Sequence, residues 1–412
     1  MDQPRALVIG GGIGGLTAAV ALRQRGWAVT VLERAPELTP VGAGLALAPN
    51  AQRALDVIGL GDRVRALSAW QGDGGLRAPG GRWLSRTSGE AVADRFGGPL
   101  VLVHRATLVS LLASALPEGV VRTGTAAALA DPGGERGPAV VSTPDGELEA
   151  ELVVAADGIR SAVRRTLFPG HPGPRYTGLT TWRVVVPAPE RSFAPHETWG
   201  RGRLWGTQPL KDGRVYAYAM ATAPEGAHAP DDERAELRRL FGDWHDPVPG
   251  IIEAADPGQV LRNDVHEMAV PLPAYHRGRV ALLGDAAHAM QPTLGQGGNQ
   301  AIEDAIVLAH HAGVDGAGRP AAEFAAGLPS HDPAAGLASY SADRLPRTTA
   351  IVRQATRTGR MTAVSNPVAV AVRDALIVAV SRLGPGIVLR GFAGIADWRP
   401  PGRTYASGTP RQ

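Results

Sequence analysis

The chain has 412 residues, of which 44% are hydrophobic and 20% charged, a balance that excludes an intrinsically disordered protein. At about 150 residues per domain, this length predicts two or three structural units. The 42 basic and 39 acidic residues leave a net charge of only +3, without blocks of like charge, so we expect no nucleic-acid partner. The sequence has no cysteine, which excludes disulfides, thiolate catalysis and cysteine-bound metals.

The sequence also lacks the usual signals for a membrane or a metal. No stretch of about 18 uncharged apolar residues occurs, and no signal peptide is evident, so we expect a cytoplasmic protein with no stable membrane association. The 11 histidines lack the spacing of metal ligands, so we predict no metal site. We expect a monomer or a homodimer.

The first 32 residues predict a strand, a turn, a helix and a second strand. Residues 5–9 form an apolar run followed by glycines, residues 16–25 have a helical pattern, and residues 28–32 are rich in β-branched side chains. This order indicates a βαβ unit of a parallel sheet.

The turn of this unit has the spacing G-x-G-x-x-G, formed by Gly10, Gly12 and Gly15. These glycines serve a tight turn, the close approach of a pyrophosphate to the backbone, and the packing of the helix on the strand. Glu33 follows the second strand, where a carboxylate can accept hydrogen bonds from ribose hydroxyls. The unit therefore predicts a dinucleotide-binding site, but it does not distinguish FAD from NAD.

Two further motifs each place an aspartate after a buried strand. Asp157 follows the apolar run 152–155, and Asp285 follows the run 279–283. Because ligands bind at the carboxyl ends of parallel strands, both carboxylates can reach a ribityl or ribose hydroxyl. The glycine-rich loop 292–299 then opens a helix, whose backbone N–H groups can stabilise negative charge on a bound ring.

The middle of the chain has a different pattern. Residues 176–222 contain strand patterns separated by turns, which indicates a largely antiparallel sheet. Helices are also predicted at residues 50–67 (with Asn50 as the N-cap), 105–116, 231–242, 299–313 and 333–382.

These patterns predict an α/β fold, in which a Rossmann-like nucleotide-binding domain carries an inserted, mainly antiparallel β-sheet substrate domain and C-terminal helices. The nucleotide-binding domain is assigned to residues 1–70, 97–168 and 279–340. The substrate domain is assigned to residues 71–96 and 169–278, and a C-terminal helical segment and tail to residues 341–412.

The three motifs, in this order and spacing, resemble those of the single-component FAD-dependent monooxygenases of the aromatic hydroxylase type. The closest subgroup includes enzymes like salicylate hydroxylase and zeaxanthin epoxidase. Further matching stretches are residues 42–50, His104-Arg105, Trp182-Arg183 and 397–401. The resemblance covers nearly the whole chain and identifies FAD as the nucleotide.

The resemblance implies roles for individual residues. Glu33 would hold the adenosine ribose, Arg34 and Arg105 the phosphate or ribityl region, and Asp285 the ribityl chain. The complete set of implied FAD-binding residues is Gly10, Gly12, Gly15, Glu33, Arg34, Gly44, Arg105, Asp157, Asp285, Gly295, Gly297, Gly298 and Asn299.

Two candidate catalytic residues follow from the same resemblance. Pro292 would lie along the isoalloxazine ring, and Arg183 would lie near the substrate, although a solvated strand arginine is an equal alternative. Tyr216, Tyr218 and His228 are candidates for a base that deprotonates a phenolic substrate. For His288 we favour a structural hydrogen bond over acid–base chemistry.

The reaction implied by the resemblance is the NAD(P)H-dependent insertion of one oxygen atom of O2 into an aromatic, phenolic or polyene small molecule, through a flavin C4a-hydroperoxide. The sequence has no second glycine fingerprint for the nicotinamide coenzyme. Two alternatives stay open: a flavin reductase or oxidase without oxygen insertion, and a non-catalytic flavin-binding protein. A flavin-dependent halogenase is disfavoured, because the typical Trp-x-Trp-x-Ile-Pro stretch does not occur and Lys211 is the only lysine that could be the essential lysine of those enzymes.

Overall fold

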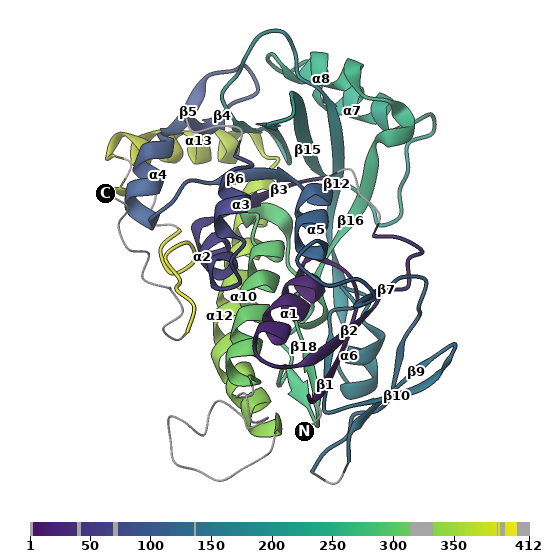
Figure 1. Ribbon diagram of the computed structural model, residues 1–412. Helices are drawn as coiled ribbons and strands as arrows, with labels where there is room; N and C mark the ends of the chain where they lie inside the picture. The colour runs from purple at the N-terminus through teal and green to yellow at the C-terminus, as the bar shows by residue number, and fades with distance from the viewer. Residues whose placement is uncertain are drawn as a thin grey trace.

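The computed structural model describes residues 3–38, 43–68, 73–135, 137–313, 333–384, 386–387 and 392–401. Two large sheets organise these residues, one of six strands and one of seven (Figure 1). The first is mainly parallel and the second mainly antiparallel. The predicted α/β fold with an added antiparallel sheet and C-terminal helices is confirmed.

The six-stranded sheet is built from chain segments that are far apart in sequence. Its order is β17-β18-β11-β1-β2-β7, and only the edge strand β17 is antiparallel to its neighbour. The strands are β1 (Arg5–Ile9), β2 (Ala28–Leu32), β7 (Val121–Arg122), β11 (Leu152–Ala155), β17 (His276–Arg277) and β18 (Val280–Leu282). Buried strands of this kind are apolar on both faces, as the runs in β1 and β11 are.

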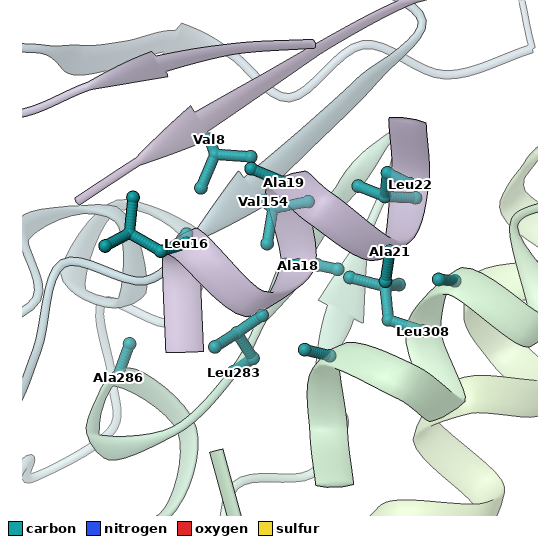
Figure 2. Packing of buried hydrophobic residues seen from close by; sticks show 14 of the residues in the cluster. Val8, Leu16, Ala18, Ala19, Ala21, Leu22, Val154, Leu283, Ala286 and Leu308 are labelled. Atoms are coloured by element: carbon teal, nitrogen blue, oxygen red, sulfur yellow. The ribbon is translucent and has the colours of Figure 1, made fainter. Parts of the chain in front are cut away.

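Helix α1 (Ile13–Gln24) lies between this sheet and α10 (Gly297–His311). Figure 2 shows Ala19 beside the strand residues Val8 and Val154, while Ala18 and Ala21 lie on the side of α1 that faces Leu308 of α10. Small residues in α1 let the two helices approach closely, because an alanine adds little volume between the backbones. This packing fixes the start of α1, where the glycine turn lies, against the sheet.

The seven-stranded sheet has one face covered by helices. On this outer face Trp182 and Trp205 pack with Phe241 of α7 (Glu233–Phe241) and Ile251 of α8 (Val248–Ala254). Figure 1 shows both helices on the side of the molecule remote from α1. The strands are β4 (Gly74–Arg77), β5 (Trp83–Thr87), β12 (Pro174–Pro187), β13 (His196–Trp199), β14 (Arg203–Pro209), β15 (Arg214–Thr222) and β16 (Leu261–Met268).

The remaining elements connect or cover the two sheets. The strands are β3 (Gly44–Leu47) and β6 (Val101–His104), which pair with each other, and β8 (Ala128–Asp131), β9 (Ala139–Thr143) and β10 (Gly146–Ala150), which form a small sheet. The helices are α5 (Arg105–Ala113), α6 (Ala162–Leu167), α9 (Asp285–His288), α12 (Pro333–Thr362), α13 (Pro367–Arg382) and the short 3-10 helices η1 (Pro257–Gln259) and η2 (Pro292–Leu294). Among the described helices, none is long and apolar enough to cross a membrane.

One expectation needs correction. The predicted helix 50–67 is two helices, α2 (Pro49–Val57) and α3 (Gly61–Arg65), and Ala48 rather than Asn50 is the N-cap of α2. A further helix that was not predicted, α4 (Gly89–Phe96), is capped by Ser88, which accepts a hydrogen bond from the Ala91 N–H.

A buried cluster of charges joins α10 to α12. Arg344 lies 2.6 Å from both Glu303 and Asp304, and all three side chains are at most 1% exposed. Burial favours the neutral form of Asp304, but His288 and Arg344 outweigh it and lower the pKa of Asp304 to about 2. The cluster therefore stays ionised, and Arg347, which lies 2.7 Å from Glu303, supplies a second cation for its two carboxylates.

Candidate active site

Four strand ends at one edge of the six-stranded sheet bring the predicted motifs together. Ile9 pairs with Leu32 on one side and with Ala155 on the other, and Ala155 pairs with Leu282. Adjacent strands lie about 4.8 Å apart, so the chain segments leaving these ends lie side by side. Those segments carry Gly10, Glu33, Asp157 and Asp285.

The glycine turn is too crowded for side chains at two of its three positions. Gly10 has φ +110°, and a Cβ there would lie 2.3 Å from the Ala156 carbonyl oxygen. A Cβ on Gly15 would lie 2.0 Å from the Gly10 carbonyl oxygen. At Gly12, the N-cap of α1, a Cβ would meet no atom within 4 Å, and no side chain caps the helix. The start of α1 thus presents backbone N–H groups to an open space, as an anion-binding helix end requires.

Two carboxylates flank this turn. Glu33 accepts hydrogen bonds from the N–H groups of Gly11 (2.6 Å) and Ala35 (2.8 Å), which hold it at the turn. Asp157 accepts one from the Val163 N–H (3.2 Å) through Oδ2, while its buried Oδ1 has no partner among the described residues. Because buried polar atoms are normally paired, Asp157 offers an acceptor for a ligand hydroxyl.

The glycine-rich loop is held in place by Asn299. The Asn299 amide accepts from the Ala48 N–H (2.9 Å) and donates to the carbonyls of Ala46 (2.9 Å) and Gly295 (2.7 Å). This side chain is completely buried, so Asn299 fixes the loop to β3 and does not offer its amide to a ligand. Asp285, in contrast, is exposed and lies beside Gly297.

The other residues of this loop lie between η2 and the first turn of α10. Gly295 has φ +61° and ends η2, which begins with the exposed Pro292. A Cβ on Gly298 would lie 3.3 Å from Leu45 of β3. The loop therefore packs closely against β3 through residues that have little or no side chain.

Strand β3 in turn contacts the inner face of the seven-stranded sheet. A Cβ on Gly44 would lie 2.2 Å from the ring of Tyr216, so only glycine allows this contact. Ala43 and Tyr216 also belong to one apolar cluster with Leu210. We call the strand ends that carry Gly10, Glu33, Asp157 and Asp285 the flavin edge. Strand β3 therefore lies between the glycine-rich loop beside this edge and the inner face of the seven-stranded sheet, which β3 contacts at Gly44.

The inner face carries polar side chains in register. Arg183 pairs with Tyr218, and Tyr218 pairs with Gly206, whose other partner is Glu197. Since directly paired residues point to the same face, Arg183, Tyr218 and Glu197 share it. Arg183 donates to Asn263 Oδ1 (2.9 Å). Burial raises the pKa of Tyr216, and the nearby Arg183 counteracts this in part.

Glu197 and Tyr218 form a tight pair on this face. The Tyr218 hydroxyl donates to Glu197 Oε1 at 2.5 Å, and the Trp199 indole N–H donates to Oε2 at 2.9 Å. Burial raises the pKa of Glu197, although both hydrogen bonds counteract it, and burial beside Glu197 raises the pKa of Tyr218. No arginine or lysine of the described residues forms an ion pair with Glu197.

The comparisons with known proteins agree with this geometry. The sequence profile of the FAD binding domain family matches residues 4–355, which is most of the chain. The chain belongs to this family of FAD-dependent monooxygenases. FAD is accordingly the nucleotide for which the strand-end motifs are built.

Similar proteins include several monooxygenases. The aurachin C monooxygenase/isomerase of Stigmatella aurantiaca is 38% identical, over 90% of this chain and 93% of the relative. The 3-amino-4-hydroxybenzoate 2-monooxygenase of Streptomyces cremeus is 37% identical, over 86% of each chain. The structure of Klebsiella pneumoniae HpxO with FAD and uric acid has a TM-score of 0.82 at 28% identity, covering 95% of this chain and 97% of HpxO.

The described residues fit FAD on three separate observations. A crowded glycine turn leads into an uncapped helix start, a buried Asp157 oxygen lacks a partner, and an exposed Asp285 stands at the neighbouring strand end. Arg34 and Arg105 are exposed and form no side-chain hydrogen bond with other described residues, which leaves both guanidinium groups for a phosphate.

Other predicted residues lie elsewhere. His228 pairs with Glu233 at 3.0 Å, and Glu233 also accepts a hydrogen bond from Trp182 of the outer face, so His228 is not a base at the inner face. His288 has the structural hydrogen bond that we favoured, to Asp304 at 2.6 Å. The described residues hold no group of three or more histidine, aspartate or glutamate side chains that could bind a metal ion.

The sequence interpretation missed two residues around the site. Arg164 is buried and donates to the carbonyls of Ala286 (2.9 Å) and Ile159 (2.7 Å), which ties the Asp157 motif to the Asp285 motif. Glu197 has no motif of its own, and only its place opposite Gly206 reveals it. Arg164 could have been recognised from the sequence by its position inside the Asp157 motif.

Proposed function

We propose that this protein is an NAD(P)H-dependent flavin monooxygenase that inserts one oxygen atom of O2 into an aromatic ring bearing a hydroxyl or amino group. The observation that carries the proposal is the contact at Gly44, through which β3 connects the flavin edge to the polar inner face of the seven-stranded sheet. A substrate between the two would have the flavin on one side and Arg183, Tyr218 and Glu197 on the other.

In this proposal the strand-end residues hold the cofactor. Gly10, Gly12 and Gly15 receive the pyrophosphate at the start of α1, and Glu33 accepts from the adenosine ribose. Asp157 and Asp285 serve the hydroxyls near the ring, and the backbone of residues 295–298 lies along it. Pro292 closes the start of this loop. Arg34 and Arg105 contribute positive charge to the phosphates.

When bound and reduced, FAD supplies the electrons that activate O2. The chain's own groups have to position the substrate and move its proton. Arg183, held by Asn263, attracts an anionic or hydroxyl substituent to the inner face. Glu197 then takes the substrate's hydroxyl proton through Tyr218, which passes on its own proton in the same step. The resulting anionic ring is richer in electrons and reacts more readily with electrophilic oxygen.

The relatives support an aromatic substrate over a polyene. They include a 3-amino-4-hydroxybenzoate 2-monooxygenase, and the structure of HpxO was solved with uric acid. Both compounds are rings that carry exchangeable O–H or N–H groups. Glu197 beside Tyr218 can accept a proton from the O–H or N–H group of such a ring, whereas a hydrocarbon chain has no such proton to give.

Oxygen insertion is expected from the FAD-loaded protein with NADH or NADPH and a panel of hydroxy- and amino-substituted aromatic acids. Under isotopically labelled O2, the correct substrate should stimulate coenzyme oxidation and give a product with one labelled oxygen atom. Mass spectrometry and peroxide assays measure both. Coenzyme oxidation that gives only peroxide with every compound indicates an oxidase, and substrate conversion without O2 indicates a reductase.

Replacing Glu197 with glutamine should lower kcat by about 100-fold, because the variant cannot accept the substrate's proton. In the wild type, kcat should fall at low pH as Glu197 becomes protonated, at a pKa above its ordinary value of 4.5. This acid limb should be missing from the pH profile of Glu197→Gln. The control is Glu253→Gln, which removes an exposed carboxylate paired with Arg238. An unchanged acid limb in Glu197→Gln would show that another group titrates.

A further inference from the structure

A cavity of about 280 Å³ lies between α9, the end of β16 and α12. Part of its wall is apolar and comes from Met268, Val270 and Val352. Four arginines also line it, Arg175 from β12 and Arg353, Arg357 and Arg360 from α12. None of these residues belongs to the flavin motifs or to the inner face of the seven-stranded sheet.

The three arginines of α12 form a cationic stripe. Their spacing of four and three residues places Arg353, Arg357 and Arg360 on one face of the helix. All three are exposed, and none forms a hydrogen bond or ion pair with any other described residue. Like charges at this spacing repel one another, so the stripe is unfavourable alone and is stabilised by an anion.

A buried histidine points to a ligand independently of the stripe. His288 lines the same cavity and is only 2% exposed. Its Nε2 is paired with Asp304, but its buried Nδ1 has no partner among the described residues. Buried polar atoms without partners are rare, so a group that enters the cavity and hydrogen-bonds Nδ1 would complete this site.

The cavity is joined to the flavin edge by one turn of helix. Helix α9 begins with Asp285, at the strand end that faces the cofactor, and ends with His288, which lines the cavity. These two residues are about 4.5 Å apart along the helix axis, at 1.5 Å per residue. A ligand in the cavity is therefore close to the redox site without occupying the substrate face.

We propose that this cavity binds the phosphate groups of the nicotinamide coenzyme, with Arg353, Arg357 and Arg360 as the contacts. The inference rests on the proposed function, in which NADH or NADPH supplies the electrons. The coenzyme is a polyanion, and the sequence has no second glycine turn to receive its pyrophosphate. Its phosphates must then be held by side-chain cations, and this stripe is unpaired and adjacent to the flavin edge.

The test is calorimetric titration of the oxidised, FAD-loaded protein with NADPH, NADH and inorganic pyrophosphate. The variant Arg353→Gln/Arg357→Gln/Arg360→Gln should bind the coenzyme at least about tenfold more weakly, since it loses three charge-assisted contacts. It should also raise KM for the coenzyme by a similar factor. The control is Arg23→Gln/Arg191→Gln/Arg382→Gln, which removes three exposed arginines remote from the cavity and changes the net charge equally.

The two triple variants and the three titrated ligands distinguish the possible outcomes. Equal weakening in both triple variants would overturn the proposal, because the effect would then come from net charge alone. Pyrophosphate that binds as tightly as both coenzymes would overturn it in favour of a free-phosphate site. Weakening of NADPH but not NADH would assign the stripe to the additional phosphate of NADPH, which supports the proposal.

Chemical reduction distinguishes this inference from the proposed function. After reduction with dithionite, followed by substrate and O2, the stripe variant should form product in the same yield as the wild type. Loss of product here, with unchanged coenzyme affinity, would show that the cavity serves the substrate and would overturn the inference. If the wild type itself forms no product, the monooxygenase proposal fails, while the calorimetric result on coenzyme binding still stands.

Discussion

Replacing Gly15 with alanine should abolish FAD binding and destabilise the protein by about 1–3 kcal/mol, the usual cost of overpacking. The new Cβ would lie 2.0 Å from the Gly10 carbonyl oxygen and 3.2 Å from Ala156 Cβ. Neither atom can retreat, because Gly10 is itself pressed against the backbone of Ala156 and its N–H donates to the Leu32 carbonyl. Flavin fluorescence titration and urea unfolding of the apoprotein measure the two effects.

Gly12→Ala is the matched comparison, because it separates cofactor binding from folding. Gly12 has φ −75°, which alanine adopts readily, and its added Cβ meets no protein atom within 4 Å. The apoprotein should therefore unfold within about 0.5 kcal/mol of the wild type. FAD affinity should nevertheless fall at least about tenfold, since the methyl group would occupy the approach of the pyrophosphate. Unchanged FAD affinity in Gly12→Ala would place the phosphates elsewhere.

Replacing Arg344 with methionine should lower the free energy of unfolding by about 3–5 kcal/mol, because Glu303 and Asp304 would lose a buried partner. Arg347 also binds Glu303 but is less deeply buried, so it compensates only in part. The control is Arg238→Met, which breaks a solvent-exposed pair with Glu253 and should leave the free energy of unfolding nearly unchanged. A loss in Arg344→Met no larger than this control's would contradict the assignment of the cluster as stabilising.

Acid sensitivity gives a second measure of the same cluster. Asp304 has an ordinary pKa of 3.8 and a pKa of about 2 in the folded protein. Its contribution to stability is therefore present above about pH 4 and is lost as the pH falls toward 2. Without Arg344, the pKa of Asp304 should rise toward its ordinary value, and acid unfolding should begin at a higher pH. Unfolding curves recorded between pH 2 and 5 test this shift.

The flavin edge could be predicted because each of its residues lies at or shortly after the end of a strand. Glycine spacing and apolar runs specify Gly10, Glu33, Asp157 and Asp285 locally, and parallel pairing brings strand ends together by rule. Asn299 shows the limit of this reasoning. Its motif suggested a contact with FAD, but its amide binds Gly295 in its own loop and also Ala46 and Ala48, which lie far from it in sequence.

Other features depend on tertiary contacts that no local pattern encodes. Asn50 has the side chain of a helix cap, but it donates to Glu303 at 2.6 Å inside the core instead. Glu197 became a site residue only through its register with Gly206 and Tyr218. The arginine stripe of α12 has a readable helical spacing, yet its significance arises from His288 and the cavity, which lies beside a strand from the middle of the chain.

The order of strands in the parallel sheet has a consequence for synthesis on the ribosome. One edge of β11 stays unpaired until its neighbour β18 has been synthesised, while some 125 residues between Ala155 and Val280 are translated. At about 5–20 residues per second this takes on the order of 6–25 s. During that interval the unpaired edge of β11 exposes backbone N–H and C=O groups, which can pair with a strand of another chain. Asp285 also emerges after this interval, so the FAD site is incomplete while this edge is unpaired, and the yield of protein in the cell should depend on chaperones that cover the edge.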